Sequence, residues 1–401
     1  MMELIEGGVT AVDGFKASGI FAGIKKVERP DLALIFCETA CNVAGVFTRN
    51  RFPAAPLLLD RKHLRKKKGQ AIIANSGNAN AFTGERGERD AEAMAEAAAR
   101  VLGVPIESVY VASTGVIGEF LPIEKITGAV PRLASQLSRS GGRAAAEAIM
   151  TTDTFLKEVA FVGKVGREEI RVGGIAKGSG MIHPNMATML GFLATDAAME
   201  PRLLQEALRQ AVNRSFNCIT VDGDTSTNDM VLCFANGRRG KEIRSRGAAY
   251  NQFAALLEAA CLSLAKMIVR DGEGATKMIE IRVTGARSDS AARRIAESIA
   301  CSSLVKTAFF GQDANWGRIV AAIGNAGVPV DPEQIDLTFG SVMLVRKGVY
   351  QGKDAESKVA ALLKQREIAL TVHLHSGRGQ AAFWTSDLSL DYVKINAAYR
   401  S

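Results

Sequence analysis

The sequence predicts an α+β fold, and three of its features lead to that class. Short apolar runs of strand length end in glycine-rich turns, and longer segments with helical spacing of apolar residues lie between them. The strand runs come as hairpin-like pairs rather than as a regular strand–helix–strand repeat, which favours α+β over a parallel sheet. The length of 401 residues predicts one large two-lobed unit or two domains, and 47% hydrophobic residues supply a proper core.

The first half of the chain is expected to contain short strands, one long helix and a hairpin. Segment 90–102 is rich in Ala and Glu and spaces its apolar residues at the helical period, so it predicts a helix. Segments 159–165 and 169–175 alternate apolar and polar residues and are split by polar ones, as the strands of a hairpin are. Further strands are expected at 32–36, 71–74 and 109–112.

The second half is expected to contain three helices and three strands. Pro201 stands where the first turn of a helix accepts a proline, because its missing N–H is not needed there. Helices are expected at 202–216, 250–269 and 290–302, strands at 279–283, 337–345 and 367–375, and a basic loop at 238–247. The clearest loose stretch of the whole chain is 138–143, in the first half.

The charge balance is basic, with a formal net charge of +8, and part of it lies in the run 61–68. Such a run can attract nucleic acid or a phosphorylated ligand, although a solvated loop or helix end has the same composition. No aromatic residues interleave the run, so a stacking platform for bases is not indicated. A basic nucleic-acid-binding protein is the non-enzymatic alternative, and it predicts steep salt-dependent binding.

The usual catalytic and metal-binding motifs are missing from the sequence. It contains no G-x-S-x-G, no G-x-x-x-x-G-K-[ST] and no H-E-x-x-H pattern. The six cysteines form no C-x-x-C pair and are expected to be reduced, mostly buried thiols. His373 and His375 share a face of a predicted strand but have no carboxylate or cysteine companions nearby in sequence, so no metal site is predicted. No signal peptide and no uninterrupted membrane-spanning stretch is found, so a cytoplasmic protein is expected.

One segment, 176–190, does not fit a plain core element. Gly178, Gly180 and Pro184 interrupt helix and central strand alike, and a methionine-rich run then leads to Ala187 and Thr188. A threonine hydroxyl can attack the carbonyl before it, and water then opens the resulting ester. The new N-terminal α-amine, with an ordinary pKa of about 7.7–8.0, can serve as the base for the neighbouring hydroxyl. The residues alone also fit a threonine in a buried turn.

The stretch KGSGMIHPNMATML (177–190) resembles the self-cleavage motif of the glutamate N-acetyltransferase, or ornithine acetyltransferase, family of arginine biosynthesis. Similar family segments follow one another along most of the chain, and together these matches are highly specific. They are NSGNAN (75–80), STGVIG (113–118), TTDT (151–154), DGDTSTND (222–229), DGEGATK (271–277), GQDANWGR (311–318) and DYVKINA (391–397).

The resemblance implies a layered αββα arrangement and cleavage between Ala187 and Thr188, which divides the chain into an alpha chain, 1–187, and a beta chain, 188–401. The two fragments are expected to stay associated in an α2β2 assembly. The implied reaction is a ping-pong transfer of an acetyl group from N-acetylornithine to glutamate through an ester on Thr188. No cofactor, metal, nucleic acid or membrane is implied, and acetyl-CoA remains open as a further acetyl donor.

The resemblance also assigns roles to individual residues. Thr114, through its hydroxyl, and Gly115, through its N–H, would stabilise the oxyanion of each tetrahedral intermediate. Lys177 would pair with a substrate carboxylate and Glu273 with an ammonium. The substrate site would be completed by Thr151 (or its neighbour Thr152), Thr188 itself, Asn396 and the terminal Ser401. Many relatives end in threonine where this chain ends in Ser401, which keeps the hydroxyl.

The rival enzymatic reading is a hydrolase on a similar self-processing scaffold, an aminopeptidase or amidase. It would share the Thr188 nucleophile but let water take the acyl group. The segments at 114–118 and 273 and the tail near Asn396 favour transfer. Free acetate released from N-acetylornithine without glutamate would distinguish the two.

Overall fold

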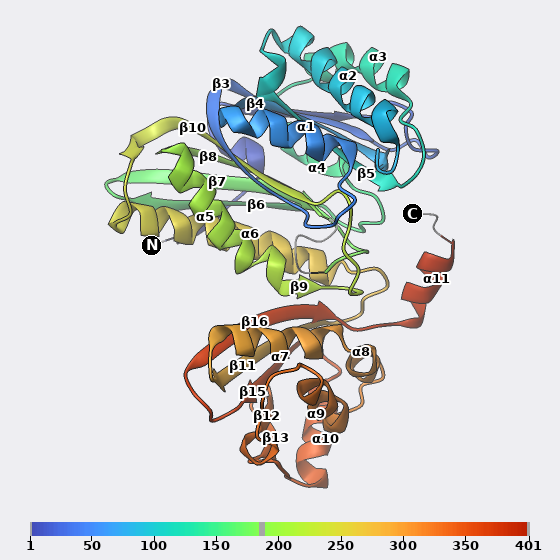
Figure 1. The fold of residues 1–401 in the computed structure, drawn as a ribbon, viewed down its shortest axis with the longest axis vertical. Coiled ribbons are helices and arrows are strands. Elements are labelled where there is room, and N and C mark those ends of the chain that lie inside the picture. Colours follow the sequence, from blue (N-terminus) through green and yellow to red (C-terminus); the bar gives the residue numbers. More distant parts are fainter. Residues whose placement is uncertain (1, 184–188, 399–401) are drawn as a thin grey trace.

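The computed structural model describes residues 2–183 and 189–398, and these form two lobes, each built on one sheet (Figure 1). The upper lobe contains a nine-stranded sheet in the order β1-β6-β7-β8-β10-β3-β4-β5, with β2 also paired to β3. Its strands are β1 (Met2–Ile5), β2 (Phe15–Ile20), β3 (Leu32–Phe47), β4 (Lys68–Asn78), β5 (Val109–Val116), β6 (Lys157–Val165), β7 (Glu168–Lys177), β8 (Leu190–Met199) and β10 (Met230–Ile243).

The sixteen-residue strand β3 divides this sheet into two leaves. Its first part, Leu32–Phe36, pairs with β2 and β4, and its last part pairs with β10. The register to β4 shifts between Phe36 and Cys41, which marks an irregularity where a strand can bend. One leaf therefore contains β2, β4 and β5, and the other contains β1, β6, β7, β8 and β10.

The side chains of the two leaves alternate between separate hydrophobic cores, as the period of two in a strand requires. On β4, Ile72 faces the core between the leaves and Ile73 faces an outer core with the helices. On β8, Phe192 faces the core between the leaves and Leu193 the opposite outer core. The layers thus run helix, sheet, sheet, helix, and the expected αββα arrangement is confirmed.

Helices α2 (Gly84–Leu102) and α3 (Ile123–Ser135) cover one leaf, and α5 (Pro201–Asn213) and α6 (Ala248–Arg270) cover the other (Figure 1). Helix α5 begins at Pro201 as expected. In the described part of the chain, α6 is long and apolar enough to cross a membrane by length and composition. Half of its apolar window is buried, and it packs against β6, β7 and α5 as the core helix of a globular lobe does. The two shorter helices of this lobe are α1 (Ala55–His63) and α4 (Gly142–Ala148).

The lower lobe is a seven-stranded sheet in the order β14-β13-β12-β15-β11-β16-β9, with helices packed on it (Figure 1). Its buried residues belong to the same continuous core as those of α5 and α6, which joins the two lobes. The elements are β9 (Ile219–Thr220), β11 (Met278–Ala286), α7 (Asp289–Cys301), α8 (Ser303–Phe310), α9 (Trp316–Gly324), β12 (Asp336–Phe339), β13 (Val342–Arg346), β14 (Val349–Tyr350), α10 (Lys353–Leu362), β15 (Glu367–His373) and β16 (Gly379–Ser386). Helix α11 (Leu390–Ala398) follows β16 and lies apart from this sheet, beside the junction of the two lobes (Figure 1).

Some expected boundaries were wrong for identifiable reasons. The strand expected at 337–345 is two strands, because Gly340 at φ 55° turns the chain between them. The loop expected at 238–247 is strand as far as Ile243, where charged residues decorate an exposed continuation of β10. Strand β15 ends at His373, and His375 follows at φ 49°.

The predictions for histidines and cysteines can be compared with the structure directly. His373 contacts Thr284 at 2.9 Å, and His375 contacts the Asp336 carboxylate at 2.8 Å. Among the residues that the structure describes, no group of three potential metal ligands occurs. The cysteines are free thiols, and all but Cys301 are buried, as expected from the sequence.

Candidate active site

Residues from seven separate segments line a small cavity of about 70 Å³ between the two leaves and the start of the lower lobe. The ends of β5 and β7, the loop after α4, the turn after α6, the segment before β10 and helix α11 all contribute, and the residue after β4 adds a seventh segment. The lining residues are Ala79, Thr114, Gly115, Ile117, Thr151, Thr152, Lys177, Gly180, Met181, Ser226, Asn228, Glu273 and Asn396.

The end of β5 brings Thr114 and Gly115 to one wall of this cavity. Gly115 has φ 135°, and an added Cβ would lie 2.3 Å from the carbonyl carbon of Gly77 on β4. Only glycine therefore lets β4 and β5 approach this closely while the backbone turns toward the cavity. Thr114 is buried, so its hydroxyl is shielded from bulk water.

Lys177, the last residue of β7, places its ammonium group on the same wall. Its Nζ donates to Thr151 Oγ1 at 2.8 Å and to Thr114 Oγ1 at 3.4 Å. The side chain is buried, and burial lowers the pKa of Lys177 below its usual range, while Asp153 opposes this shift. A buried ammonium held among hydroxyl groups is a strong site for an incoming carboxylate.

A buried group of charges beneath the cavity fixes Lys177 in place. Asp153 Oδ1 accepts from Lys157 Nζ at 2.7 Å and from the Gly178 N–H at 2.7 Å, and its Oδ2 lies 3.9 Å from Lys177 Nζ. Asp271 accepts a hydrogen bond from Lys157 and completes a set of two carboxylates and two ammonium groups. Burial alone would raise the pKa of Asp153, but Lys177, Lys157 and the Gly178 N–H outweigh it and hold that pKa well below its usual value.

The opposite wall carries a carboxylate, that of Glu273, in the turn after α6. Asn396 on α11 donates from Nδ2 to Glu273 Oε2 at 2.8 Å. An added Cβ at Gly180 would lie 2.3 Å from the same oxygen, so this glycine makes room for the carboxylate. The docking of α11 is tight, since Ser389 Oγ donates to the Gly274 carbonyl at 2.6 Å.

The segment before β10 forms the remaining wall and holds the chain on both sides of the undescribed residues. Asn228 Nδ2 donates to the carbonyls of Ala79, at 2.6 Å, and Ser113, at 2.8 Å. Asp222 accepts the Met181 N–H at 2.6 Å, before that gap, and Asp229 accepts the Met189 N–H at 2.9 Å, after it.

Two carboxyl groups of this segment have raised pKa values. Burial raises the pKa of Asp222 to about 6, although backbone N–H donors oppose the shift. Burial likewise raises the pKa of Asp229 well above its usual range, against the Met189 N–H. Both groups therefore hold their protons at a higher pH than an exposed aspartate does.

The structure brings six sequence-predicted site residues to this one cavity: Thr114, Gly115, Thr151, Lys177, Glu273 and Asn396. Thr151 and Thr152 both line it, but Thr151 is the hydrogen-bond partner of Lys177, whereas Thr152 bonds to Ser179. The remaining predicted residues, Ala187, Thr188 and Ser401, lie outside the described residues.

Sequence reasoning did not assign roles to several residues that shape the site. Asp153 and Asn228 lie in segments that resemble the family, but their positioning contacts depend on the fold. Lys157 lies outside those segments, and in sequence it looks like an ordinary surface lysine.

The cavity as a whole combines a wall of hydroxyl and N–H donors, one ammonium group and one facing carboxylate. This arrangement can bind a small zwitterion and stabilise an oxyanion.

The chain is similar to known proteins over its whole length. Residues 16–401 match the model of the ArgJ family. The chain is 51% identical over 403 residues to the arginine biosynthesis bifunctional protein ArgJ of Symbiobacterium thermophilum, covering 100% of both chains. It is 51% identical over 391 residues to the protein of the same name from Geobacter sulfurreducens, covering 97% of this chain and 100% of the relative.

Solved structures give similar matches over part of the chain. The crystal structure of ArgJ from Bacillus halodurans matches at 43% identity and a TM-score of 0.44, covering 47% of this chain and 98% of that one. Ornithine acetyltransferase from Mycobacterium tuberculosis, complexed with ornithine, matches at 41% identity and a TM-score of 0.43, covering 46% and 98%. On the whole-length sequence matches, the chain belongs to the ArgJ family of bifunctional arginine-biosynthesis enzymes, and the resemblance to the glutamate N-acetyltransferases is confirmed.

Proposed function

We propose that this enzyme transfers an acetyl group from N2-acetyl-L-ornithine to L-glutamate by a ping-pong mechanism, with Thr188 as the nucleophile. The observation that carries the proposal is the small cavity that Thr114, Gly115, Lys177 and Glu273 line together. It combines oxyanion donors with one positive and one negative group, which matches a substrate that carries a carboxylate, an ammonium group and an acyl group.

The first half-reaction follows from this arrangement. The Thr188 hydroxyl attacks the acetyl carbonyl of N-acetylornithine, and the α-amine of Thr188 takes the hydroxyl proton. The resulting oxyanion accepts hydrogen bonds from the Thr114 hydroxyl and the Gly115 N–H. Collapse breaks the C–N bond, the ornithine amine leaves with the proton from the α-amine, and the acetyl group stays as an ester on Thr188.

The second half-reaction reverses the order with a different amine. The α-amine of glutamate attacks the ester carbonyl, the same donors stabilise the oxyanion, and the Thr188 oxygen leaves and recovers a proton. Lys177 binds the substrate carboxylate, Glu273 binds the ornithine side-chain ammonium, and Thr151 and Asn396 hold these two groups in position. Ser401 is proposed as a further hydroxyl of the site, and acetyl-CoA as a further acetyl donor.

Self-cleavage between Ala187 and Thr188 would free the α-amine that the reaction requires. It would divide the chain into fragments 1–187 and 188–401, and strand pairing supports their continued association. Strand β7 of the first fragment pairs with β8 of the second, and β3 pairs with β10, through backbone hydrogen bonds. Two copies of each fragment would give the α2β2 assembly that the family resemblance implies.

The test is the Thr188→Ala variant beside the wild type and Thr188→Ser. Intact-mass analysis and N-terminal sequencing should find two fragments in the wild type, the second beginning at Thr188, and a single chain in Thr188→Ala. Transfer from N-acetylornithine to glutamate should disappear in Thr188→Ala and persist in Thr188→Ser, which keeps a hydroxyl. Full turnover by an uncut chain would exclude the mechanism.

A hydrolase on the same scaffold is separated by one further measurement. The wild type is incubated with N-acetylornithine in the presence and absence of glutamate, and free acetate and N-acetylglutamate are quantified. Transfer predicts N-acetylglutamate with glutamate present and little acetate without it. Rapid acetate release that glutamate does not suppress would assign the site to a hydrolase instead.

A further inference from the structure

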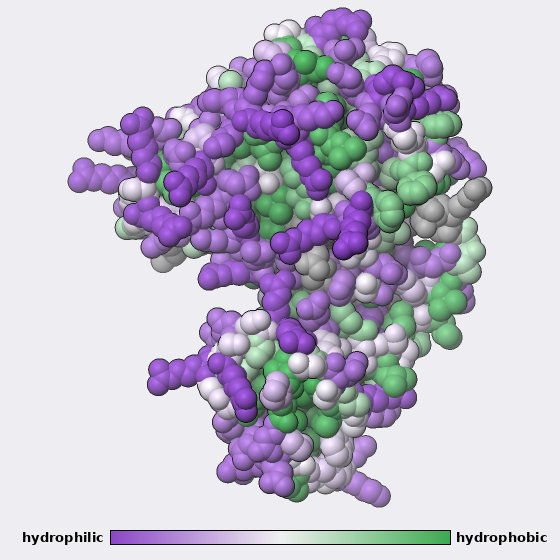
Figure 2. Space-filling view, in the orientation of Figure 1, coloured by the Kyte–Doolittle hydropathy of each residue, from purple (hydrophilic) through white to green (hydrophobic). Residues whose placement is uncertain are grey.

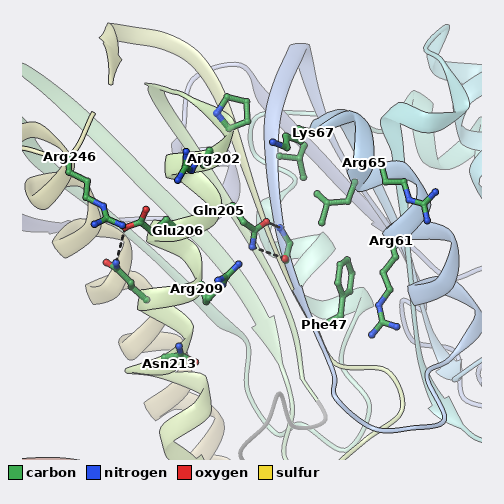
Figure 3. Close-up of a pocket in the computed structure, with 15 residues that line it drawn as sticks. Phe47, Arg61, Arg65, Lys67, Arg202, Gln205, Glu206, Arg209, Asn213 and Arg246 are labelled. Atoms are coloured by element: carbon green, nitrogen blue, oxygen red, sulfur yellow. Dashed lines mark hydrogen bonds and ion pairs between the residues drawn. The ribbon is translucent and has the colours of Figure 1, made fainter. Parts of the chain in front are cut away.

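A second, much larger hollow lies in the upper lobe, outside the cavity described above. It lies between α1 with the short 3₁₀ turn Leu64–Lys66 on one side and α5 on the other, and its volume is about 760 Å³ (Figure 3). An adjoining hollow of about 660 Å³ shares Gly45, Phe47, Arg61, Gln205 and Arg209 with it. The two form one continuous feature, which we name the arginine groove.

The groove exists because β3 pairs with β4 over only the first part of its length. Pairing between the two strands ends at Asn42 and Lys68, and the stretch Val43–Phe47 pairs only with β10. The free edge at Gly45 is satisfied by Gln205 of α5, which accepts from the Gly45 N–H at 3.1 Å and donates to its carbonyl at 3.0 Å. The floor of the groove is therefore a fixed strand edge rather than a mobile loop.

The lining of the groove is strongly cationic. In Figure 3, Arg61, Arg65 and Lys67 lie on the α1 side of the groove. Arg202 and Arg209 lie on α5, with Arg246 beyond them. The two hollows together carry eight cationic side chains and one carboxylate, Glu206, in a chain whose formal net charge is +8. The cationic residues are Arg49, Arg51, Arg61, Arg65, Lys67, Arg202, Arg209 and Arg246.

Most of these charges lack a carboxylate partner in the part of the chain that the structure describes. The one carboxylate is already paired, since Glu206 Oε1 lies 2.7 Å from Arg246 Nη2. Within residues 2–183 and 189–398, the other seven basic groups have no carboxylate within 4.0 Å, and Arg61 donates only to the Thr48 carbonyl, at 3.1 Å. Clustered like charges repel one another, so an arrangement of this kind favours an anionic ligand.

Another basic hollow of this chain differs from the groove in how its charges are paired. The hollow of about 630 Å³ at Arg238 and Arg239 includes acidic side chains in its lining. There Arg238 pairs with Glu38 at 2.9 Å and Arg239 with Asp13 at 3.4 Å. The chain thus pairs Arg238 and Arg239 with carboxylates at one hollow, whereas seven of the eight basic groups of the arginine groove have no carboxylate partner among the described residues.

The groove also has an apolar surface beside its charges. Phe47, Leu64 and Val43 belong to the lining, and the Arg61 guanidinium lies 5.7 Å from the centre of the Phe47 ring. Apolar surface is visible among hydrophilic side chains in the region between α1 and α5 (Figure 2). A half-buried aromatic ring flanked by guanidinium groups suits a planar base next to phosphates.

The arginine groove and the small cavity of the candidate active site are separated by residues 225–226, which bond to Thr48 and Asn50. Thr48 Oγ1 donates to the Ser226 carbonyl at 2.8 Å, and Asn50 Nδ2 donates to the Thr225 carbonyl at 3.1 Å. Ser226 also lines the small cavity, whereas Thr48 and Asn50 line the groove. A ligand in the groove would therefore have one end close to the proposed acetyl site.

We propose that the arginine groove binds a nucleoside that carries two or more phosphate groups. The guanidinium groups of Arg65, Arg202 and Arg209 bind the phosphates, and the Phe47 side binds the base. Two sources share this chemistry, a free nucleoside diphosphate and the phosphorylated adenosine end of coenzyme A. The groove carries this proposal by itself and does not require the acetyl transfer proposed above.

The test is calorimetric titration of the full chain as purified, at low ionic strength, with ADP, coenzyme A, pyrophosphate and adenosine as separate probes. ADP and coenzyme A should bind, pyrophosphate should bind more weakly than ADP, and adenosine should bind most weakly. Binding should weaken as salt is raised, because the interacting charges are exposed. Competition between coenzyme A and ADP assigns the groove to the nucleotide end of the coenzyme, and binding of ADP alone assigns it to the free nucleotide.

The variant Arg65→Gln/Arg209→Gln tests the location, since neither side chain belongs to the acyl cavity. It should weaken ADP binding on the order of tenfold or more, because two charge-assisted contacts are lost. The control variant Arg100→Gln/Arg287→Gln removes two exposed arginines elsewhere and should bind as the wild type does. Thermal midpoints and transfer from N-acetylornithine to glutamate should be unchanged in both variants, which separates this test from that of the proposed function.

Three outcomes would overturn the proposal. The first is that neither ADP nor coenzyme A binds the wild type with a Kd below about 1 mM. The second is that the groove variant binds them as well as the control does. The third is that a short DNA duplex binds more tightly than ADP, which would assign the groove to nucleic acid, or that the groove variant changes the sedimentation coefficient while it still binds nucleotide, which would assign the groove to a subunit contact.

Discussion

The buried charges beneath the cavity should make Asp153→Asn one of the most destabilising single substitutions in this chain. Asp153 is 6% exposed and accepts from Lys157 Nζ, the Gly178 N–H and the Thr151 N–H at 2.7–2.9 Å. An amide keeps one acceptor oxygen but turns two donors toward groups that are themselves donors. It also leaves the buried ammonium group of Lys177 without its ion-pair partner, and that of Lys157 with only the Asp271 carboxylate.

The magnitude follows from the cost of breaking a buried ion pair on one side, about 3–5 kcal/mol. This is a large part of a net stability that is typically about 5–15 kcal/mol. Urea unfolding followed by far-ultraviolet circular dichroism measures it at fixed protein concentration. Circular dichroism is preferred to fluorescence because both tryptophans, Trp316 and Trp384, lie in the lower lobe.

The matched control is Asp354→Asn on α10. Asp354 pairs with Lys358 at 2.7 Å, but its side chain is 83% exposed, so its loss should leave the unfolding midpoint unchanged within error. A loss below about 1 kcal/mol for Asp153→Asn would contradict the reasoning. It would mean that water or a shift of the lysines compensates the missing charge.

Three further predictions follow from the site. Gly115→Ala should lower the rate of acetyl transfer about 100-fold and reduce the thermal midpoint, because its Cβ would lie 2.3 Å from Gly77. The control Gly118→Ala is also at positive φ but in open space, so it should cost only backbone strain of about 1–3 kcal/mol. Equal effects of the two substitutions would contradict the close-approach argument. The raised pKa of Asp222, about 6, contributes stability that is present below the ordinary value of 3.8 and is lost as the pH rises through about 6. Urea midpoints of wild type and Asp222→Asn at about pH 4 and pH 7 should therefore show the wild type gaining on the variant toward low pH. Glu273→Gln should raise KM for N-acetylornithine on the order of tenfold and change KM for glutamate less, because the charge-assisted contact to the ornithine ammonium is lost; steady-state kinetics with each substrate varied would show it, and equal losses would reject the assignment.

Much of the fold could be predicted because local pattern and final environment agree. The alternation in β6 and β7 and the apolar spacing in α6 and α7 are directly visible in the sequence, and these elements form where expected. The full length of β3 was not predictable, because Glu38, Thr39 and Ala40 are exposed and interrupt its apolar pattern. Its continuity depends on pairing with β10, nearly two hundred residues away.

The candidate site, like the fold, was predictable only in part from the sequence. Thr114, Lys177 and Glu273 were found through motifs in separate segments, and only the fold shows that they share a cavity. Lys157 could not be found, because a buried lysine and a solvated one have the same letter in a sequence. The arginine groove was equally hidden. The run 61–68 was visible as a charge, but its counterparts Arg202 and Arg209 come from a helix far along the chain.

The pairing of β7 with β8 has a consequence for the order in which the molecule is made. Lys177 and Leu190 are opposite each other in the ladder, and the antiparallel strands β7 and β8 both lie inside the sheet rather than at its edge. Strand β8 is held on its other side by β10, through a parallel register that a short loop cannot create. The proposed scission between Ala187 and Thr188 would create a new chain terminus between two strands of an assembled sheet, so we expect folding to precede cleavage. If the two fragments were translated separately, each would expose a strand edge that has no partner until the fragments meet. We therefore expect them to aggregate rather than to reconstitute the enzyme.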